Sequence, residues 1–221
     1  MKDVDTLEHF LTTTKQVRRR LDLTRQISLD VVMDCIDIAS RAPIGGNLQI
    51  NRWLLVDDAD TKAKLADIYR KFGVGYAQAG RDQVEAVGSD ATAIRVLESA
   101  EYLLEHLHEV PLMIVPLRLD RPGTSTFEQA TFWGSVTPGV WSLQVALRSR
   151  SIDSAWTTLH LEHEDEAAAV LGLPNTVTQI ALLPTGFFTG DGFVPSKRGP
   201  AAEVTYHNKW KQSVVLASES S

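Results

Sequence analysis

The chain has 221 residues, 43% of them hydrophobic, which is enough apolar material for one sizeable core. Its formal net charge of -6 excludes a general positive field for holding nucleic acid or an anionic membrane, so any anion site must be local. The single cysteine, Cys35, excludes an intramolecular disulfide. Because no apolar run reaches the roughly 20 residues of a membrane span, we expect a cytoplasmic protein with no membrane partner.

The first predicted elements are a helix, a turn and a strand. Apolar periodicity predicts a helix with Ser28 as its N-cap that continues to about Ala42, where Pro43 stops it. The apolar run over residues 53–57 predicts a short strand. A second helix is expected to follow with Asp60 as its N-cap, and Gly73 is expected to end it.

The middle of the chain alternates between polar and strongly apolar segments. Residues 74–90 are polar and contain glycines, which predicts a loop or a mobile helix. Apolar residues then recur at helical spacing over 96–107, and residues 110–118 read as a buried strand. A long helix is expected over residues 127–150 even though it would contain Pro138, which removes a backbone hydrogen bond.

The last third predicts two strands, a short helix and an extended tail. Residues 151–159 and 176–186 read as strands, and the helix between them is expected to end at Gly172. Tyr206 and Trp210 lie in the tail. Because strands and helices mix without a strict βαβ alternation, we expect an α+β fold. No composition shift marks a linker, so residues 1–221 are expected to form one domain, with a mixed, mostly antiparallel sheet flanked by helices.

Two basic segments are candidates for holding an anion. The first concentrates five cations in an otherwise acidic chain: Lys15, Arg18, Arg19, Arg20 and Arg25. Guanidinium groups suit phosphate because they offer two parallel, charge-assisted hydrogen bonds. The second segment, "VPSKRGP", contains Lys197 and Arg198, which would complete a phosphate clamp if the fold brought both segments together. For each segment alone, a solvated surface charge run is the alternative.

The turn "RAPIGGNLQINRW" interrupts the chain between a helix and a strand. Gly45 and Gly46 allow the backbone to approach a flat ligand closely. Asn47 and Gln49 each offer hydrogen-bond donors and acceptors, which can bind the edge of a heteroaromatic ring. An ordinary helix-to-strand turn is the alternative.

A further polar segment, "SAWTTLH", offers an aromatic surface at Trp156 and hydroxyls at Thr157 and Thr158. A half-buried strand explains the same alternation. The histidine and cysteine spacings match no zinc motif, and the chain has no Walker loop, nucleophile elbow or G-x-G-x-x-G fingerprint. "GYAQAG" and "GFFTGDGF" are only glycine-bearing loops by this criterion. We therefore name no catalytic side chain and no metal ligand.

Taken in order, these segments resemble the flavin-dependent nitroreductase family over roughly residues 10–210. The resemblance is carried by "VRRRLDLTRQIS", by "RAPIGGNLQINRWLLVDD" after a helix, by the Trp-Thr-Thr strand end and by the "VPSKRGP" loop. It implies a three-layer sandwich around a mixed sheet. It also implies an intertwined homodimer with two FMN sites at the interface, each built from both chains.

The resemblance assigns cofactor-binding roles to particular residues of this chain. The flavin phosphate and ribityl chain are expected to contact Lys15, Gln16 and Arg18, with a second phosphate segment at Lys197 and Arg198. The turn beside the flavin, contributed by the partner chain, is expected to comprise Pro43, Ile44, Gly45, Asn47 and Gln49. The edge of the isoalloxazine ring is expected to lie near Thr157, Thr158 and Leu159.

The implied activity is that of an FMN-dependent oxidoreductase. Such an enzyme transfers a hydride from NADH or NADPH through the flavin to an oxidised small molecule, such as a nitroaromatic or a quinone, and the cofactor carries the difficult chemistry. Specialised flavin-fragmenting, dehalogenating or enoate-reducing members are alternatives. A protein that binds or sequesters FMN without turnover, and a protein whose basic cluster is mere surface, are the alternatives from other classes.

Overall fold

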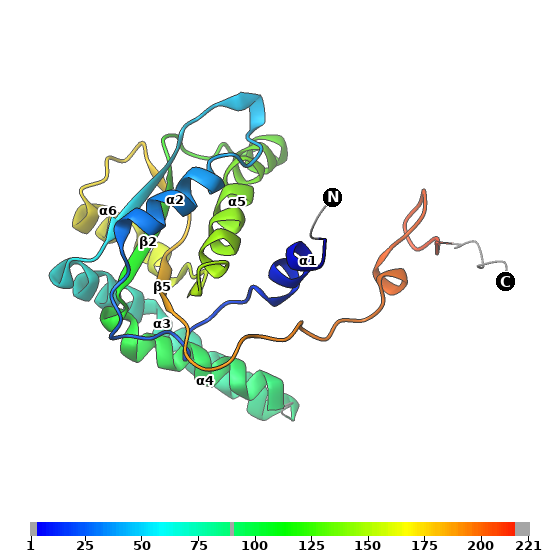
Figure 1. Ribbon diagram of the computed structural model, residues 1–221, viewed down its shortest axis with the longest axis horizontal. Helices are drawn as coiled ribbons and strands as arrows, with labels where there is room; N and C mark the ends of the chain where they lie inside the picture. Colours follow the sequence, from blue (N-terminus) through cyan, green and yellow to red (C-terminus); the bar gives the residue numbers. More distant parts are fainter. Residues whose placement is uncertain (1–3, 89–90, 215–221) are drawn as a thin grey trace.

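The structure is a computed structural model that describes residues 4–88 and 91–214. Within these residues, helices cover both faces of one sheet (Figure 1). The neighbouring strands are, in spatial order, β1 (Asn51–Val56), β2 (Leu112–Arg118), β5 (Leu183–Phe187) and β3 (Ile152–Ser154). A short strand, β4 (Thr178–Gln179), also pairs with β2. Every described pair is antiparallel, so the expectation of a mixed sheet is wrong for these residues.

The central strand β2 separates two hydrophobic cores. Successive side chains of a strand point to opposite faces, and accordingly Met113 and Val115 join one core while Leu112 and Ile114 join the other. The first core is covered by α3 (Ala59–Val87), α4 (Ala91–His106) and α6 (Glu164–Leu171). The second is covered by α2 (Leu29–Ala39) and α5 (Thr126–Arg148). The chain therefore has the three-layer α+β arrangement that the sequence predicted.

Helix starts follow local capping chemistry. Helix α2 begins after Ser28 as predicted, although the Ser28 hydroxyl makes no capping hydrogen bond, and it ends at Ala39, a little before Pro43. The N-cap of α3 is Asp58 rather than Asp60, because the Asp58 carboxylate accepts a hydrogen bond from the Thr61 backbone N–H.

Helix α5 has the strongest cap and contains a proline. Ser125 and Glu128 form a reciprocal capping box at its start. The helix then continues through Pro138, as predicted, to Arg148. It packs along α2 on one face of the sheet (Figure 1).

Helix α3 does not end at Gly73, and the predicted loop after it is helical as far as Val87. Gly73 is required for packing rather than for a helix end. A Cβ atom at Gly73 would lie 2.3 Å from Leu104 Cδ2 of α4, so the missing side chain lets the two helices approach closely. The sequence pattern alone identifies glycine with helix termini and does not reveal this tertiary contact.

The two predicted C-terminal strands are shorter than expected. Residues 176–186 divide into β4 and β5, and the interruption faces Pro116 of β2. The Ile180 N–H donates to the Pro116 carbonyl at 2.9 Å, but Pro116 has no N–H to return the bond, so the ladder breaks there. Residues 151–159 contribute β3, then an isolated bridge between Thr157 and Leu182, then a 3-10 helix (Leu159–His163).

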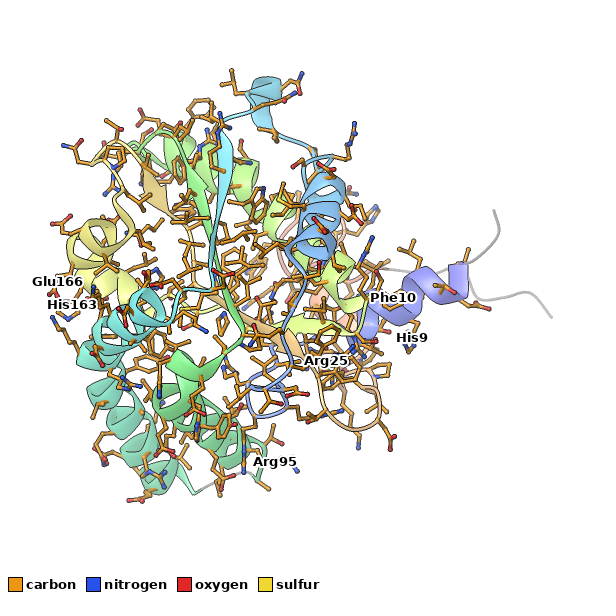
Figure 2. All side chains as sticks on the ribbon, turned by 60° about the vertical axis from the view of Figure 1, so that its left-hand side comes forward. His9, Phe10, Arg25, Arg95, His163 and Glu166 are labelled. Carbon is orange, nitrogen blue, oxygen red and sulfur yellow. The ribbon has the colours of Figure 1, made fainter. Side chains whose placement is uncertain are left out.

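Both ends of the described chain leave the body on the same side (Figure 1). An N-terminal helix that the sequence analysis did not predict, α1 (Val4–Thr13), projects outward, and Figure 2 shows His9 and Phe10 on it. Residues 194–214, here called the C-terminal arm, extend away from the sheet, as predicted for the tail, and are almost entirely exposed. A short 3-10 helix (Ala201–Val204) lies within the arm. No described helix combines the length and apolar character needed to cross a membrane.

Candidate functional site

The basic cluster near the N-terminus divides into engaged and unengaged cations. Arg19 forms an ion pair with Glu98 at 3.2 Å. Arg20 donates hydrogen bonds to the backbone carbonyls of Thr189 and Asp191, just before the C-terminal arm. The Arg25 guanidinium lies 3.4 Å from the ring centroid of Phe187. These three arginines therefore have partners within the chain.

Lys15 and Arg18 are the unengaged members. Both side chains are half-buried, and no hydrogen bond or ion pair joins either one to another residue in the described part of the chain. They line an open groove of about 370 Å³ whose wall also includes Gln16, Phe193 and, from α4, Arg95. A groove with two uncompensated cations suits an anionic ligand.

Gln16 ties this basic segment to the polar strand end. The Trp156 backbone N–H donates to Gln16 Oε1, and Gln144 Nε2 lies 3.4 Å from the same oxygen. Gln144 also donates to Ser154 Oγ at 3.1 Å, and the Val17 N–H donates to the Ser154 carbonyl at 3.0 Å. The segment 15–18 therefore lies directly beside residues 154–157, and the structure brings these two predicted parts of the site together.

Thr157 connects the strand end to α3. Its buried Oγ1 lies 2.8 Å from the Tyr69 hydroxyl, and burial raises the pKa of Tyr69, so the phenol stays protonated. Thr158 is exposed next to it, whereas Leu159 packs against the core. Tyr69 was not among the site residues expected from the sequence. Its hydroxyl could have drawn attention, since a buried tyrosine usually has a hydrogen-bond partner.

His160, immediately after Leu159, is a second residue that the sequence analysis missed. Its side chain is 1% exposed, and neither ring nitrogen has a hydrogen-bond partner among the described residues. Burial lowers the pKa of His160 to about 4, so the imidazole is neutral at physiological pH. A lone histidine outside any motif gives no sequence signal of this kind.

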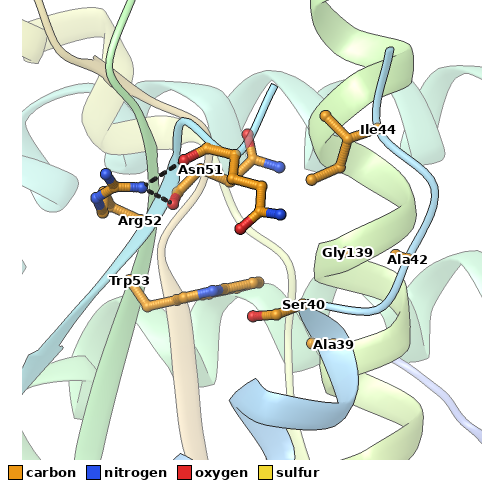
Figure 3. Close-up of a pocket in the computed structure, with 9 residues that line it drawn as sticks. Ala39, Ser40, Ala42, Ile44, Asn51, Arg52, Trp53 and Gly139 are labelled. Atoms are coloured by element: carbon orange, nitrogen blue, oxygen red, sulfur yellow. Dashed lines mark hydrogen bonds between the residues drawn. The ribbon is translucent and has the colours of Figure 1, made fainter. Parts of the chain in front are cut away.

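The glycine-bearing turn lies against α5. The Gly45 N–H donates to Ser135 Oγ at 3.2 Å, and Asn51 Nδ2 donates to the Ser135 carbonyl at 3.0 Å. A pocket of about 190 Å³ opens between the turn, α2 and α5, and Trp53, Ile44 and Gln49 help to line it (Figure 3). The other predicted turn residues, Pro43, Gly45 and Asn47, are exposed.

Within one chain, this turn is far from the basic segment. The turn leads into Asn51, which pairs with Arg118 at one end of β2. The basic segment lies beside Ser154, which pairs with Thr185, and Thr185 pairs with Leu112 at the other end of β2. The two ends are separated by the length of the strand, about 20 Å at 3.3 Å per residue.

Lys197 and Arg198 are also separate from the basic segment. Both are exposed on the C-terminal arm, and Arg198 Nη1 donates only to the Lys197 carbonyl, at 2.9 Å. No hydrogen bond or ion pair in the described chain joins them to Lys15 or Arg18. One chain therefore does not assemble the phosphate clamp that the sequence suggested.

The described residues include no group of three or more histidine, cysteine, aspartate or glutamate side chains that could hold a metal ion. Cys35 lies on the buried face of α2, and burial raises the pKa of its thiol. A buried thiol held in its protonated form is a poor nucleophile.

Comparison with known proteins identifies the family of this chain. Residues 13–187 match the model of the Nitroreductase family. The chain therefore belongs to the nitroreductase family. No curated protein sequence matches it.

Solved structures share the fold at low sequence identity. A BluB-like flavoprotein from Clostridium difficile 630 is 18% identical, with a TM-score of 0.66 over 92% of this chain and 99% of that chain. An iodotyrosine deiodinase bound to FMN and 3-iodo-L-tyrosine is 18% identical, with a TM-score of 0.65 over the same shares. The FMN and NADPH-dependent nitroreductase NfnB from sphigopyxis sp. strain HMH is 18% identical, with a TM-score of 0.64 over 92% and 99%.

Proposed function

We propose that this protein is an FMN-dependent oxidoreductase that takes a hydride from NADH or NADPH and reduces an oxidised small molecule such as a nitroaromatic or a quinone. The observation that carries the proposal is the pair of half-buried cations, Lys15 and Arg18, which lie beside a polar strand end and have no anionic partner among the described residues. Family membership supplies the cofactor class, since structurally similar proteins are described as bound to FMN or as FMN and NADPH-dependent.

The residues present fit FMN. A phosphate monoester carries close to two negative charges, and Lys15 and Arg18 offer two positive ones. Gln16 is held in place by Trp156 and Gln144, so its remaining polar atoms are oriented toward the ribityl chain in this proposal. Thr157 and Thr158 then supply a polar edge for the isoalloxazine ring.

Two copies of the chain are needed for this site. Large apolar side chains are exposed on α1 and on the C-terminal arm, including Leu7 (58%), Val204 (78%) and Trp210 (78%). Exposed apolar surface of this extent is typical of an interaction site. We propose a homodimer in which the partner contributes the turn with Pro43, Ile44, Gly45, Asn47 and Gln49. The partner's arm would contribute the second phosphate segment.

Bound FMN would supply the redox chemistry, because the flavin accepts a hydride and passes electrons to the acceptor. The chain's own contribution is binding and orientation. Lys15 and Arg18 neutralise the phosphate, Gln16 fixes the segment that carries them, and the strand end at Thr157 sets the edge of the site. No side chain of the chain has to act as a general acid or base.

Reconstitution followed by anaerobic reduction tests this function. Purified protein is incubated with FMN, desalted and examined for the visible absorbance of oxidised flavin. It is then mixed anaerobically with NADH or NADPH in a stopped-flow instrument. Retention of flavin that bleaches with a nicotinamide, and recovers on addition of a quinone, is expected. Flavin that is retained but never bleaches would indicate a storage protein, and failure to retain flavin would contradict the proposal outright.

A further inference from the structure

The loop at the root of the C-terminal arm encloses two arginine side chains. This loop belongs to "GFFTGDGF", which matched no nucleotide-binding motif. Arg20 Nε donates to the Thr189 carbonyl at 2.7 Å, and its Nη2 donates to the Asp191 carbonyl. The Arg20 guanidinium also lies 4.2 Å from the ring centroid of Phe193. Because its guanidinium contacts two backbone carbonyls and an aromatic ring, Arg20 fixes the path of the loop backbone.

The second arginine supports the same loop from inside. The Arg148 guanidinium lies 4.3 Å from the ring centroid of Phe188 and 4.6 Å from that of Phe193. Arg148 is anchored by Asp153, with its Nη1 at 3.0 Å from Asp153 Oδ2, and both side chains are buried. The rings of Phe188 and Phe193 are therefore held between the guanidinium groups of Arg148 and Arg20.

The backbone of the loop is shaped to fit around Arg20. Gly190 has a φ of 75°, a conformation that residues with side chains rarely adopt. A Cβ atom at Gly190 would lie 3.3 Å from Arg20 Nη2, so the chain turns tightly around the guanidinium at this point. Among the described residues, the side chain of neighbouring Arg19 is engaged only by Glu98, at the surface.

We propose that Arg20 and Arg148 form a clamp that sets the direction in which the C-terminal arm leaves the body. Arg20 is then a positioning residue for Lys197 and Arg198, and not a ligand of the flavin phosphate, although it belongs to the same basic cluster. The effect on flavin rests on the proposed function. The effect on the arm does not, because every contact of the clamp lies within one chain.

Limited chymotrypsin digestion of the full chain tests the clamp, because Phe188 and Phe193 are half-buried against the two guanidinium groups. Chymotrypsin cleaves after Phe188, and cleavage there is followed by mass spectrometry. Arg20→Gln is expected to raise the cleavage rate about tenfold, because lost hydrogen bonds of about 1.4 kcal/mol increase the released population by that factor. Arg19→Gln is the matched control and is expected to cleave at the wild-type rate. Arg20→Lys keeps the charge but not the fork, and is expected to resemble Arg20→Gln.

Flavin affinity, measured on the same variants, separates the outcomes. Weaker FMN binding together with faster cleavage at Phe188 in Arg20→Gln supports the clamp. Weaker binding with wild-type cleavage, rescued by Arg20→Lys, would mean that Arg20 contacts the phosphate and would overturn the proposal. Faster cleavage of Arg20→Gln, in a protein that never binds FMN, would support the clamp and remove only the proposed function. If Arg20→Gln does not fold, Phe193→Leu removes the aromatic face and gives the same test.

Discussion

The Tyr69 hydroxyl lies 2.8 Å from Thr157 Oγ1, although 88 residues separate the two in the sequence. Both groups are buried, so this contact ties helix α3 to the strand end beside Lys15 and Arg18. The polar edge of the candidate site is therefore held by the core and not by surface loops. This arrangement suits a site that must keep a planar ligand in one orientation.

Replacing Tyr69 with phenylalanine is expected to lower the free energy of unfolding by about 1–2 kcal/mol. The variant leaves the buried Thr157 hydroxyl without this partner, and an unsatisfied buried polar group is unfavourable by that amount. Urea denaturation followed by circular dichroism measures the change. Tyr76→Phe, on the same helix with a 59% exposed side chain, is the control and should change stability little. Equal effects of the two substitutions would show that the Tyr69 contact contributes nothing.

The double variant Lys197→Ala/Arg198→Ala is expected to weaken FMN binding by tenfold or more while leaving the fold unchanged. Each charge-assisted hydrogen bond to phosphate contributes about 1.5–3 kcal/mol, and both residues are exposed in the single chain. Fluorescence titration with FMN gives the dissociation constant. Lys209→Ala/Lys211→Ala removes the same charge from the same arm and serves as control. Full flavin affinity in the first variant would remove Lys197 and Arg198 from the phosphate site.

His160 is expected to make the protein less stable as the pH falls from about 6.5 to about 4. Its pKa is about 4 in the folded chain and near 6.5 when unfolded, so over this range the unfolded state binds the extra proton and is favoured. The loss amounts to about 2 kcal/mol between pH 7 and pH 5. His160→Met removes the titrating group, so this loss of stability on acidification should be absent from the variant, as measured by urea unfolding at each pH.

Asp153 acts in the opposite direction over an overlapping range. Burial outweighs the attraction of Arg148 and raises the pKa of Asp153 to about 6, so the folded state takes up a proton before the unfolded state does. Stability from this group is therefore present at low pH and is lost as the pH rises through about 6. His160→Met removes the opposing effect of His160. Acidification of this variant from pH 6 to pH 5 should therefore increase its free energy of unfolding. If the stability of wild type and His160→Met changed with pH in parallel, the contribution assigned to His160 would be contradicted.

Local chemistry predicted much of the fold. The fully buried strand β2, the long helix α5 through Pro138 and the left-handed Gly172 that ends α6 all follow from neighbouring residues. The errors arose where a distant residue decides the outcome. Gly73 continues a helix because Leu104 packs on it, and the strand over residues 176–186 breaks because Pro116 on another strand lacks a donor.

The candidate site was predictable in its parts but not in its assembly. Sequence reasoning found Lys15, Gln16 and Arg18 together with Thr157 and Thr158, and the structure brings these segments together. The residue pattern alone did not separate Arg20, whose donors bind the backbone just before the arm, from Arg18, whose side chain has no hydrogen-bond partner among the described residues. Only the family resemblance singled out Arg18. That distinction depends on contacts between residues more than 160 positions apart, which no local pattern records.

The central claim is that one flavin site is built from two chains, and subunit mixing tests it most directly. Lys15→Ala/Arg18→Ala damages the basic segment, and Asn47→Ala/Gln49→Ala damages the turn. Each variant alone is expected to lose FMN. After the two are unfolded together and refolded as a mixture, half of the dimers should contain both variants, and each of these should have one intact site. The mixture should therefore recover about a quarter of the wild-type flavin content. A mixture that recovers no flavin, although mixed dimers are present by native mass spectrometry, would contradict a site shared between chains.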